Sequence, residues 1–296
     1  MKIAITGASG LIGSALTPAL GASGHEVVRL VRREPSAGEI FWDPSLGTID
    51  AAGLAGVDAV VHLSGATIGR RWTAARKAEI LESRVASTKL MATTLAALEP
   101  RPRALVCAGG AGIYGDRGDE ILTEESELGS GFLAEVGIAW EGAAEPAREA
   151  GIRVVNFRQG IVLSRDDGAL PRMLTPFRLG VGGRIGSGKQ WWSWVGTDDL
   201  VAAYSFALEH AELSGPVDLT SPNPVTNSQF VSALGRALRR PTIFPLPAVA
   251  VRTLFGEMGE SALLQGQRAL PARLLDAGFE FRYAVLDAAL ARALES

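Results

Sequence analysis

The sequence predicts an α/β fold, a doubly wound and mostly parallel sheet followed by a small C-terminal α+β extension. Short apolar segments rich in β-branched residues alternate with longer stretches of helical periodicity, which is typical of βαβ units. Right-handed crossovers then place helices on both faces of the sheet. The expected strands are 2–6, 26–31, 57–63, 103–107 and 153–157, and the expected helices are about 11–22, 73–98 and 133–149.

The pattern changes after the fifth strand. Residues 164–190 are rich in glycine and show no strong periodicity, and so long a connection in a compact domain is usually functional or mobile. Periodicity returns with a helix near 197–210, a short strand at 216–219 and a helix near 226–239. We expect this part of the chain to lie on the substrate side of the sheet.

Three prolines, Pro241, Pro245 and Pro247, indicate a boundary near the end of the chain. The sequence therefore predicts two domains, 1–245 and 246–296. In the second, aromatic residues alternate along 279–283, which predicts a short strand, and a helix follows at 285–294. This unit is too small for a good core of its own, so we expect it to pack against the substrate side of the first domain.

Composition excludes several classes of protein. The net charge of −3 and the dispersed basic residues argue against a nucleic-acid partner. No apolar run approaches the roughly 18 residues of a membrane helix, and no secretory signal precedes the first strand, so we expect no membrane partner. Cys107 is the only cysteine, which excludes an intramolecular disulfide and a cysteine zinc cage. We expect a cytoplasmic protein without a metal site.

A glycine-rich turn joins the first strand to the first helix. Gly7, Gly10 and Gly13 in the segment GASGLIG suit a sharp turn, a close backbone approach to a pyrophosphate, and tight packing of helix on sheet. The free amides at the start of the helix favour phosphate binding. In this strand–turn–helix context we favour a Rossmann dinucleotide site over a turn without a ligand. Its expected contacts are Gly7, Ser9, Gly10, Leu11, Ile12 and Gly13.

Arg32 stands at the end of the second strand, where an NAD-binding domain usually places an acidic residue. A guanidinium donates to a 2′-phosphate, whereas an acid would accept from a 2′-hydroxyl. The sequence therefore predicts NADP(H) as the cofactor, with Arg32 as its 2′-phosphate ligand. The alternative is that Arg32 and the neighbouring Arg33 are only solvated surface charges.

With these motifs the chain resembles the extended branch of the short-chain dehydrogenase/reductase superfamily, the sugar-nucleotide epimerases and their relatives. The segments VDAVVHLSGA (57–66) and WVGTDDL (194–200) carry the resemblance. It is closest to a subgroup of epimerase-like members with RRW (70–72), ESR (82–84), YGD (114–116), GGRIGSGKQ (182–190) and GQRALP (266–271). The last motif lies in that subgroup's C-terminal domain of unknown function.

The resemblance implies further cofactor contacts. The loop after the third expected strand would pass under the cofactor, and Arg84 takes the place of a cofactor-facing Asn. Glu79 would orient Arg84, Arg70 or Arg71, or instead belong to an exposed helix with weak ion pairs. Val162 would lie near the nicotinamide, or be ordinary core. The contacts that the resemblance implies are Leu63, Ser64, Gly65, Ala66, Glu79, Arg84 and Val162.

The acid/base pair of typical members is missing. They use Tyr-x-x-x-Lys, in which the lysine lowers the tyrosine pKa so that the phenol exchanges a proton during hydride transfer. The residues four positions after Tyr114, Tyr204 and Tyr283 are not lysines. The helix expected to carry the pair has Phe132 or Leu133 and Val136 or Gly137 in its place, and the serine region offers Gly109.

We consider Tyr114 the first candidate for a replacement catalytic residue, because a phenol near a cofactor can donate or accept a proton. The loop that it opens also holds Asp116, Glu124 and Glu125, and for each of these we favour the simpler interpretation of a solvated loop residue. His62, at a strand end, is expected to be a packed, hydrogen-bonded core residue.

The sequence thus favours an NADP(H)-binding oxidoreductase or epimerase with atypical catalytic residues. Its substrate would be a small polar molecule, such as a nucleotide sugar, and the resemblance implies a homodimer as one assembly. Lys189 could meet an anionic substrate, and the nearby tryptophans 191, 192 and 194 are either a pocket wall or core. The alternative is a regulatory or scaffold protein that binds NADP(H) without turnover.

Overall fold

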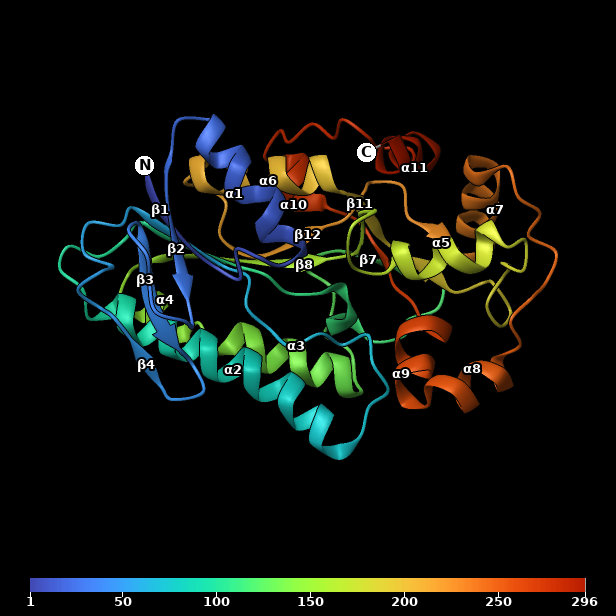
Figure 1. Cartoon of the computed structure of the whole chain (residues 1–296), viewed down its shortest axis with the longest axis horizontal. Helices are drawn as coiled ribbons and strands as arrows, with labels where there is room; N and C mark the ends of the chain where they lie inside the picture. The colour runs from blue at the N-terminus through green and yellow to red at the C-terminus, as the bar shows by residue number, and fades with distance from the viewer. Residues whose placement is uncertain (296) are drawn as a thin grey trace.

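The computed structural model describes residues 1–295 and is built around an eight-stranded sheet (Figure 1). The strand order is β12-β8-β6-β5-β1-β2-β3-β4, and every neighbouring pair is parallel except β3 with β4. Starting from β1, the chain first adds β2, β3 and β4 on one side of this strand and then adds β5, β6, β8 and β12 on the other side, as in a doubly wound fold. The strands are β1 Lys2–Thr6, β2 Glu26–Val31, β3 Glu39–Asp43, β4 Thr48–Ile49, β5 Ala59–His62, β6 Ala104–Cys107, β8 Arg153–Gln159 and β12 Gly215–Leu219.

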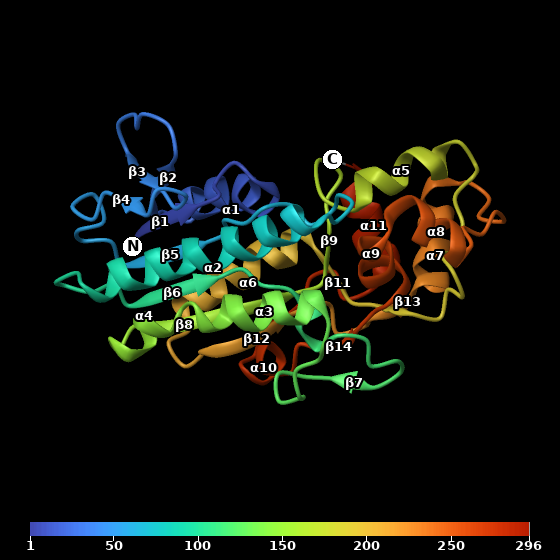
Figure 2. The same cartoon turned by 90° about the horizontal axis from the view of Figure 1, so that it is seen from below.

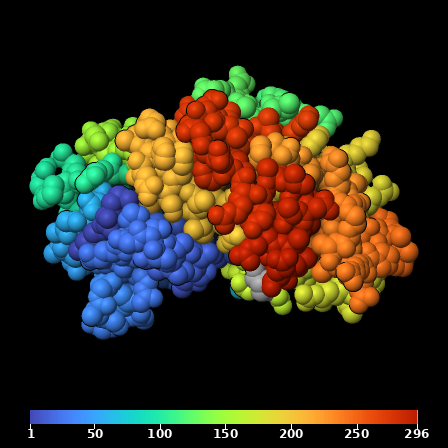
Figure 3. All heavy atoms as spheres, turned by 90° about the horizontal axis from the view of Figure 1, so that it is seen from above, coloured from blue at the N-terminus to red at the C-terminus, as the bar shows by residue number. Residues whose placement is uncertain are grey.

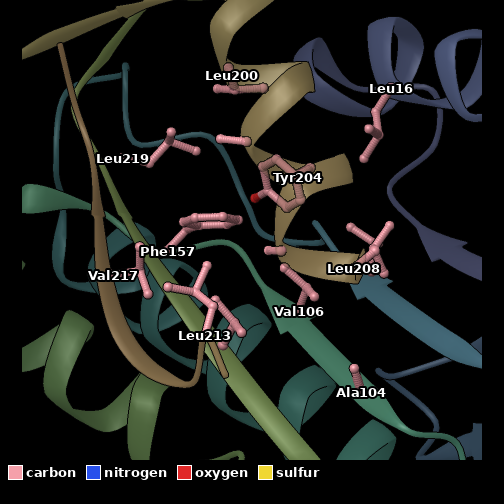
Figure 4. Packing of buried hydrophobic residues seen from close by; sticks show 14 of the residues in the cluster. Leu16, Ala104, Val106, Phe157, Leu200, Tyr204, Leu208, Leu213, Val217 and Leu219 are labelled. Atoms are coloured by element: carbon pink, nitrogen blue, oxygen red, sulfur yellow. The ribbon is translucent and has the colours of Figure 1, made fainter. Parts of the chain in front are cut away.

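Helices cover both faces of this sheet, as the βαβ pattern predicts (Figure 1). On one face lie α1 (Leu11–Ala22) and α6 (Thr197–Glu209), whose buried side chains share a core with the central strands. Figure 4 shows Phe157 of β8 and Tyr204 of α6 meeting in that core, and their ring centroids are 4.7 Å apart. On the other face lie α2 (Ala74–Ala96), α3 (Phe132–Gly142) and α4 (Glu145–Glu149).

The strands predicted between residues 2 and 219 are confirmed within two residues at each end, and α1, α2, α6 and α7 (Asn227–Leu238) are confirmed as helices. One long helix predicted over 133–149 is instead two, α3 and α4. Pro146 is in the first turn of α4, where a backbone N–H would have no partner within the helix. Inside a helix begun at Phe132, the same proline would remove a hydrogen bond and clash with the preceding turn.

The connection 164–190 contains a helix that we did not predict, α5 (Leu170–Arg178). It begins with Pro171 in its first turn and buries Leu170, Leu174 and Phe177 on one side. With α7 it packs around small two-stranded sheets at one end of the molecule (Figure 2). Their strands pair as β9 (Ile161–Leu163) with β11 (Trp194–Gly196), and β10 (Trp191–Trp192) with β13 (Val225–Thr226).

The chain from residue 246 onwards contains mostly helices. These are α8 (Ala248–Phe255), α9 (Glu257–Gly259), the π-helix η2 (Glu260–Leu264), α10 (Ala272–Asp276) and α11 (Leu286–Glu295). Figure 3 shows the last of these residues, in red, lying between the surfaces of α6 and α7. A short strand, β14 (Arg268–Ala269), pairs with β7 (Ile121–Leu122) of the preceding domain.

The prediction of a strand over 279–283 is wrong, because these residues form no strand in the structure. The backbone N–H groups of Arg282 and Tyr283 donate to the buried carboxylate of Asp199, at 2.7 and 2.9 Å, instead of to another strand. Phe279 and Phe281 still pack together, with ring centroids 4.8 Å apart, and Phe279 joins the main core. The alternation of aromatic residues therefore correctly indicates which side chains are packed. It gives no sign that the Asp199 carboxylate binds the backbone N–H groups that a strand would use to pair.

Within residues 1–295, no helix is long and apolar enough to cross a membrane. The same part of the chain holds no group of three or more His, Cys, Asp or Glu side chains that could bind a metal ion.

Candidate functional site

The glycine-rich turn after β1 forms the centre of the candidate site. Gly7 has φ of +66°, a left-handed conformation that glycine adopts without strain, and its carbonyl accepts from Gly10 N at 3.0 Å. A Cβ on Gly13 would lie 2.3 Å from that same carbonyl oxygen, so only glycine lets α1 start so close to the turn. These are the roles that the sequence predicts for Gly7 and Gly13.

The start of α1 is open toward solvent. Its N-cap is Gly10, which offers no side chain to cap the helix, and Ser9 and Gly10 are both exposed. The next residues, Leu11 and Ile12, are half-buried. The first amides of the helix therefore face a surface free of side-chain caps, which is the arrangement that binds phosphate groups.

The loop Leu63–Ala66 lies directly beside this turn. A Cβ on Gly7 would sit 3.1 Å from the Leu63 backbone, so the two loops meet at the carboxyl edge of β1 and β5. Leu63 N donates to the Thr6 hydroxyl at 3.1 Å, and Ala66 N donates to Ser83 Oγ at 3.0 Å. The predicted contacts Leu63, Ser64, Gly65 and Ala66 thus form a backbone segment fixed at both ends.

His62 supports this loop from below. It is fully buried, with its ring 2.9 Å from Thr6 Oγ1 and 3.2 Å from Ser87 Oγ. Burial lowers the pKa of His62 to about 4, because the charged ring would lose its hydration. His62 is therefore a neutral, hydrogen-bonded core residue.

Arg84 lies against the same loop from α2. Its Nη1 donates to the Ala66 carbonyl at 2.9 Å and to the Ile80 carbonyl at 3.1 Å, and its guanidinium stacks 4.8 Å from the Trp140 ring. A Cβ on Gly65 would come within 3.2 Å of the guanidinium carbon. Burial, with a smaller contribution from Arg76, lowers the pKa of Arg84 to about 10, so the side chain stays charged at neutral pH. Arg84 therefore places a cation at the loop's edge.

Glu79 does not reach Arg70, Arg71 or Arg84. Its carboxylate pairs with Arg76 one helical turn earlier, and Arg76 in turn donates to the Thr67 carbonyl. The Glu79 side chain is 57% exposed. The structure thus gives Glu79 a role in orienting Arg76, through which it acts on the loop only indirectly.

Two neighbouring arginines at the end of β2 differ in their surroundings. Arg33 pairs with Glu39 at 2.8 Å and donates to the Glu34 carbonyl. Glu39, whose side chain is only 1% exposed, also pairs with Arg29. Arg32 is exposed, and within residues 1–295 its guanidinium forms no ion pair or hydrogen bond, although it lies near enough to Asp43 to help lower the pKa of that carboxyl. Its guanidinium is therefore more available to a ligand than that of Arg33.

Val162 is in β9, opposite Val195 of β11, and is partly buried against the main core. The loop after β9 comes back toward the glycine-rich turn, since a Cβ on Gly168 would lie 3.1 Å from the Leu11 side chain. Val162 therefore lies on a segment that borders the candidate site and also contributes to packing.

The helix expected to carry Tyr-x-x-x-Lys presents apolar side chains instead. Phe132 packs edge-on against Trp72 at 4.9 Å, and Val136 is buried with Ile80 and Met258 in one cluster. A Cβ on Gly137 would lie 2.9 Å from Ile113, and one on Gly109 would lie 2.5 Å from the Phe157 carbonyl. This volume is filled by packing, with no titratable side chain at the two positions.

Tyr114, the sequence candidate for catalysis, is fully buried. Its hydroxyl donates to Asp218 Oδ2 at 2.8 Å and accepts from Arg158 Nη1 at 3.0 Å, while Arg158 pairs with Glu141. Burial and the nearby Asp218 carboxylate raise the pKa of Tyr114 well above its ordinary value. This geometry opposes the predicted proton transfer and favours a structural role for the phenol.

The acidic residues of the following loop also serve packing. The buried Glu124 accepts from the backbone amides of Asp218 and Arg273 at 2.9 and 3.2 Å. Glu125 pairs with Arg273 at 2.6 Å, whereas Asp116 is exposed. Glu124 and Glu125 therefore join the loop to α10 in the C-terminal region.

The tryptophans divide between core and surface. Trp192 and Trp194 are buried, while Trp191 is half-buried, donates to Asp119 at 2.7 Å and stacks with Arg268. Lys189 is exposed, and within residues 1–295 its side chain forms no ion pair or hydrogen bond. Two of the three tryptophans are therefore core, and Trp191 packs at the surface between Asp119 and Arg268.

A family model described as NAD dependent epimerase/dehydratase family matches residues 3–218, and a second, a domain of unknown function, matches residues 246–293. The chain belongs to the NAD dependent epimerase/dehydratase family. Epimerase family protein MT2273 of Mycobacterium tuberculosis is 46% identical over 290 residues, which cover 97% of this chain and 96% of that protein. Human epimerase family protein SDR39U1 is 37% identical over 294 residues, with 98% of each chain covered.

Solved structures with the same fold cover nearly the whole of this chain. Human SDR39U1 with NADPH has a TM-score of 0.92 at 37% identity, with 100% of each chain covered. A nucleoside-diphosphate sugar epimerase of Corynebacterium glutamicum has a TM-score of 0.82 at 40% identity, and the match covers 99% of this chain and 58% of that one. A UDP-N-acetylglucosamine 4-epimerase of Bacillus cereus, at 16% identity and a TM-score of 0.77, shares the fold.

Within this family site, sequence reasoning missed the side chains that support the loop Leu63–Ala66. Thr6, Ser83 and Ser87 are ordinary hydroxyl residues in a strand and a helix, and no spacing marks them as partners. In the sequence, Ser83 stands out only as the central residue of the ESR motif, which gives it no role. The one available signal was polarity at buried positions, because a buried hydroxyl needs a hydrogen-bond partner.

Proposed function

We propose that this protein binds NADP(H) along the edge formed by the glycine-rich turn, the loop Leu63–Ala66 and Arg32. The proposal includes hydride-transfer chemistry, as an oxidoreductase or epimerase acting on a small polar metabolite. The observation that carries it is the contrast at the end of β2, where Arg33 is held by Glu39 and Arg32 is free. A free guanidinium beside a dinucleotide turn suits a 2′-phosphate.

The backbone around the turn fits a dinucleotide. A Cβ on Gly10 would meet a single atom, the Gly7 carbonyl oxygen at 3.4 Å, so the space above this residue is open. We assign the pyrophosphate to the amides of Ser9 through Gly13, the 2′-phosphate to Arg32, and the remaining contacts to Leu63, Ser64, Gly65, Ala66, Arg84 and Val162. The bound nicotinamide would supply or accept a hydride. A relative at 37% identity was solved with NADPH, which supports the same phosphorylated cofactor here.

The substrate that we propose is a polar, anionic small molecule such as a nucleotide sugar. Arg70 and Lys189 are exposed, and within residues 1–295 neither side chain forms an ion pair or hydrogen bond, so both are available to an anionic group. A relative at 40% identity is described as a nucleoside-diphosphate sugar epimerase, which supports this substrate class.

A regulatory protein that binds NADP(H) without turnover is the second candidate. It is favoured by one specific observation, the apolar packing of Phe132 and Val136 where the family's tyrosine and lysine are expected. If the protein is such a regulator, it should bind NADPH but should not transfer a hydride to any substrate.

Turnover separates the two candidates. The purified protein would be offered keto sugars and small carbonyl compounds with NADPH, and nucleotide sugars with NADP⁺, while the absorbance of reduced nicotinamide is followed. Sugar isomers would be separated by chromatography, because an epimerase leaves the total cofactor unchanged. A substrate-dependent signal supports the enzyme, whereas calorimetric binding of NADPH with no product across the panel supports the regulator.

Three broader expectations belong to this proposal. We infer a division into domains 1–245 and 246–296, which the start of the second family match at residue 246 supports. We infer a cytoplasmic location from the single, unpaired Cys107. A homodimer formed through helices that flank the sheet is the assembly that we would test first.

A further inference from the structure

Two loops lie side by side at the end of the molecule farthest from the N-terminal strands (Figure 2). They comprise residues 178–184, after α5, and residues 239–246, after α7, and we call them together the distal tip. Gly183 forms an isolated β-bridge with Ile243, and Leu246 N donates to the Arg184 carbonyl at 2.8 Å. The backbone thus holds the two loops together as one surface.

The distal tip exposes large apolar side chains. Leu179 and Val181 are 73% and 55% exposed on one loop, and Ile243 and Phe244 are 72% and 54% exposed on the other. Single exposed apolar residues are ordinary, whereas four on two bridged loops form a contiguous patch of the kind that marks an interaction site. Val249 and Leu254 of the adjacent α8 are exposed as well.

The charge along these two loops and the chain next to them is of one sign. None of the chain's 32 acidic residues falls within 168–197 or 219–256, although the protein as a whole has a net charge of −3. Arg178, Arg184, Arg239 and Arg240 flank the apolar residues in sequence, are exposed, and form no ion pair within residues 1–295. The partner of this surface should therefore be both anionic and apolar.

We propose that the distal tip docks on an anionic lipid bilayer, with its apolar side chains inserted at the headgroup level and its arginines among the lipid phosphates. Apolar residues bordered by Arg suit the interfacial region, and each cation near an anionic leaflet strengthens binding. This is attachment to a membrane surface, a partner that we did not expect from the sequence, because the relevant residues are divided between two loops 60 positions apart.

Shape and charge favour a bilayer over other occupants. Two hollows found on the described surface lie elsewhere, one beside β4 and α2 and one beside α11, and no residue of the distal tip lines either. A bound peptide helix needs a groove, whereas the apolar side chains of the distal tip project from two exposed loops. In a two-fold contact, a second copy of the chain would bring the same arginines against each other without a carboxylate between them.

Co-sedimentation with vesicles tests this proposal on the full-length protein. We expect binding to vesicles of equal parts phosphatidylcholine and phosphatidylglycerol, weakening as salt is added, and little binding to phosphatidylcholine alone. The double variant Arg239→Gln/Arg240→Gln should bind roughly thirtyfold more weakly, given the usual contribution of each cation near the surface. Phe244→Ser should also weaken binding.

Matched controls are Lys89→Gln and Leu46→Ser, because both side chains are exposed and lie outside the distal tip, on α2 and beside β4. Thermal melts confirm that each variant folds, and NADPH titration gives a separate measure of the cofactor site. The proposal is overturned if the protein ignores anionic vesicles at low salt, if neutral vesicles bind equally well, or if the controls lose as much binding as the tip variants. It is equally overturned if Phe244→Ser dissociates a dimer without changing vesicle binding, or if only an acidic protein binds the tip.

Discussion

Individual side chains beneath the loop Leu63–Ala66 hold its backbone in place through hydrogen bonds. Thr6 accepts from Leu63 N, and the same hydroxyl meets His62, whose other ring nitrogen meets Ser87. The loop is thus joined to both β1 and α2 by buried polar groups, each of which would be destabilising without its partner. A change of protonation at His62 should therefore be felt as a change in stability.

The pH dependence of stability tests the neutral state of His62. Its pKa falls from 6.5 to about 4 on folding, so the folded state disfavours the proton that the unfolded state binds. Above pH 6.5 this group adds no pH dependence. As the pH falls from 6.5 to 4, the protein should lose roughly 3 kcal/mol through this residue.

The comparison variant is His62→Gln, which has an amide that does not titrate. Urea denaturation across that pH range should show a shallower loss of stability in the variant than in the unaltered protein. Parallel curves would mean that His62 takes up its proton as readily in the folded state as in the unfolded chain.

Tyr114→Phe distinguishes the two roles of the phenol. The variant leaves the buried Asp218 carboxylate without its Tyr114 donor, so we expect about 1–3 kcal/mol lower stability. Where a substrate has been found, turnover should change little at temperatures where the variant is folded. A fall of about 10²-fold or more in kcat with unchanged stability would restore Tyr114 as an acid/base residue.

At the level of elements, the strand–turn–helix unit that opens the chain is specified by its glycines. Gly13 and Gly21 lie in the same helix, yet a Cβ on Gly13 would overlap the Gly7 carbonyl, whereas a Cβ on Gly21 would meet nothing within 4 Å. The two positions therefore provide a matched pair for the same substitution.

Gly13→Ala should disrupt the turn and abolish NADPH binding in calorimetry, since α1 must move away from Gly7. Gly21→Ala should leave binding intact and stabilise the protein by about 0.5–1 kcal/mol, because alanine is the better helix residue. Equal nucleotide affinity in the two variants would show that the turn tolerates the shift and is not a tight cofactor cradle.

The elements that the sequence predicted best are those whose pattern is local. β1, β2 and α1 follow from period and turn chemistry alone, and so do the turn at Gly7 and the close packing at Gly13. Helix α5 was missed because its two prolines, and the glycines on either side of it, obscure an apolar face that only the fold reveals. The support of Leu63–Ala66 by Ser83 and Arg84, and the capture of 282–283 by Asp199, depend on pairs distant in sequence, for which periodicity carries no signal.

At the scale of the whole molecule, the C-terminal region and the preceding domain share their packing. Leu274 and Phe279 are buried in the main core, β14 pairs with β7, and Met258 joins the cluster on α2 and α3. Lys77 of α2 pairs with Glu257 at 2.7 Å. The second domain therefore completes the first, although a separate family model describes it.

Truncation after Leu246 tests this dependence. Removing the remainder uncovers the main core near Phe206 and leaves Glu124 without the amide of Arg273, so we expect a large drop in thermal stability and a broad, less cooperative transition. A truncated chain with the melting temperature and NADPH affinity of the full protein would show that the region is an independent appendage.

The central claim, that the free Arg32 makes this a site for the phosphorylated dinucleotide, is tested most directly by calorimetric titration with NADPH and NADH. A charge-assisted hydrogen bond from Arg32 to the 2′-phosphate contributes about 1.5–3 kcal/mol, so NADPH should bind roughly tenfold or more tightly than NADH. Arg32→Ala should remove that preference, while Arg33→Ala should keep it, because Arg33 is already paired with Glu39. Equal affinities for the two nucleotides in the unaltered protein, or a preference that survives Arg32→Ala, would contradict the account.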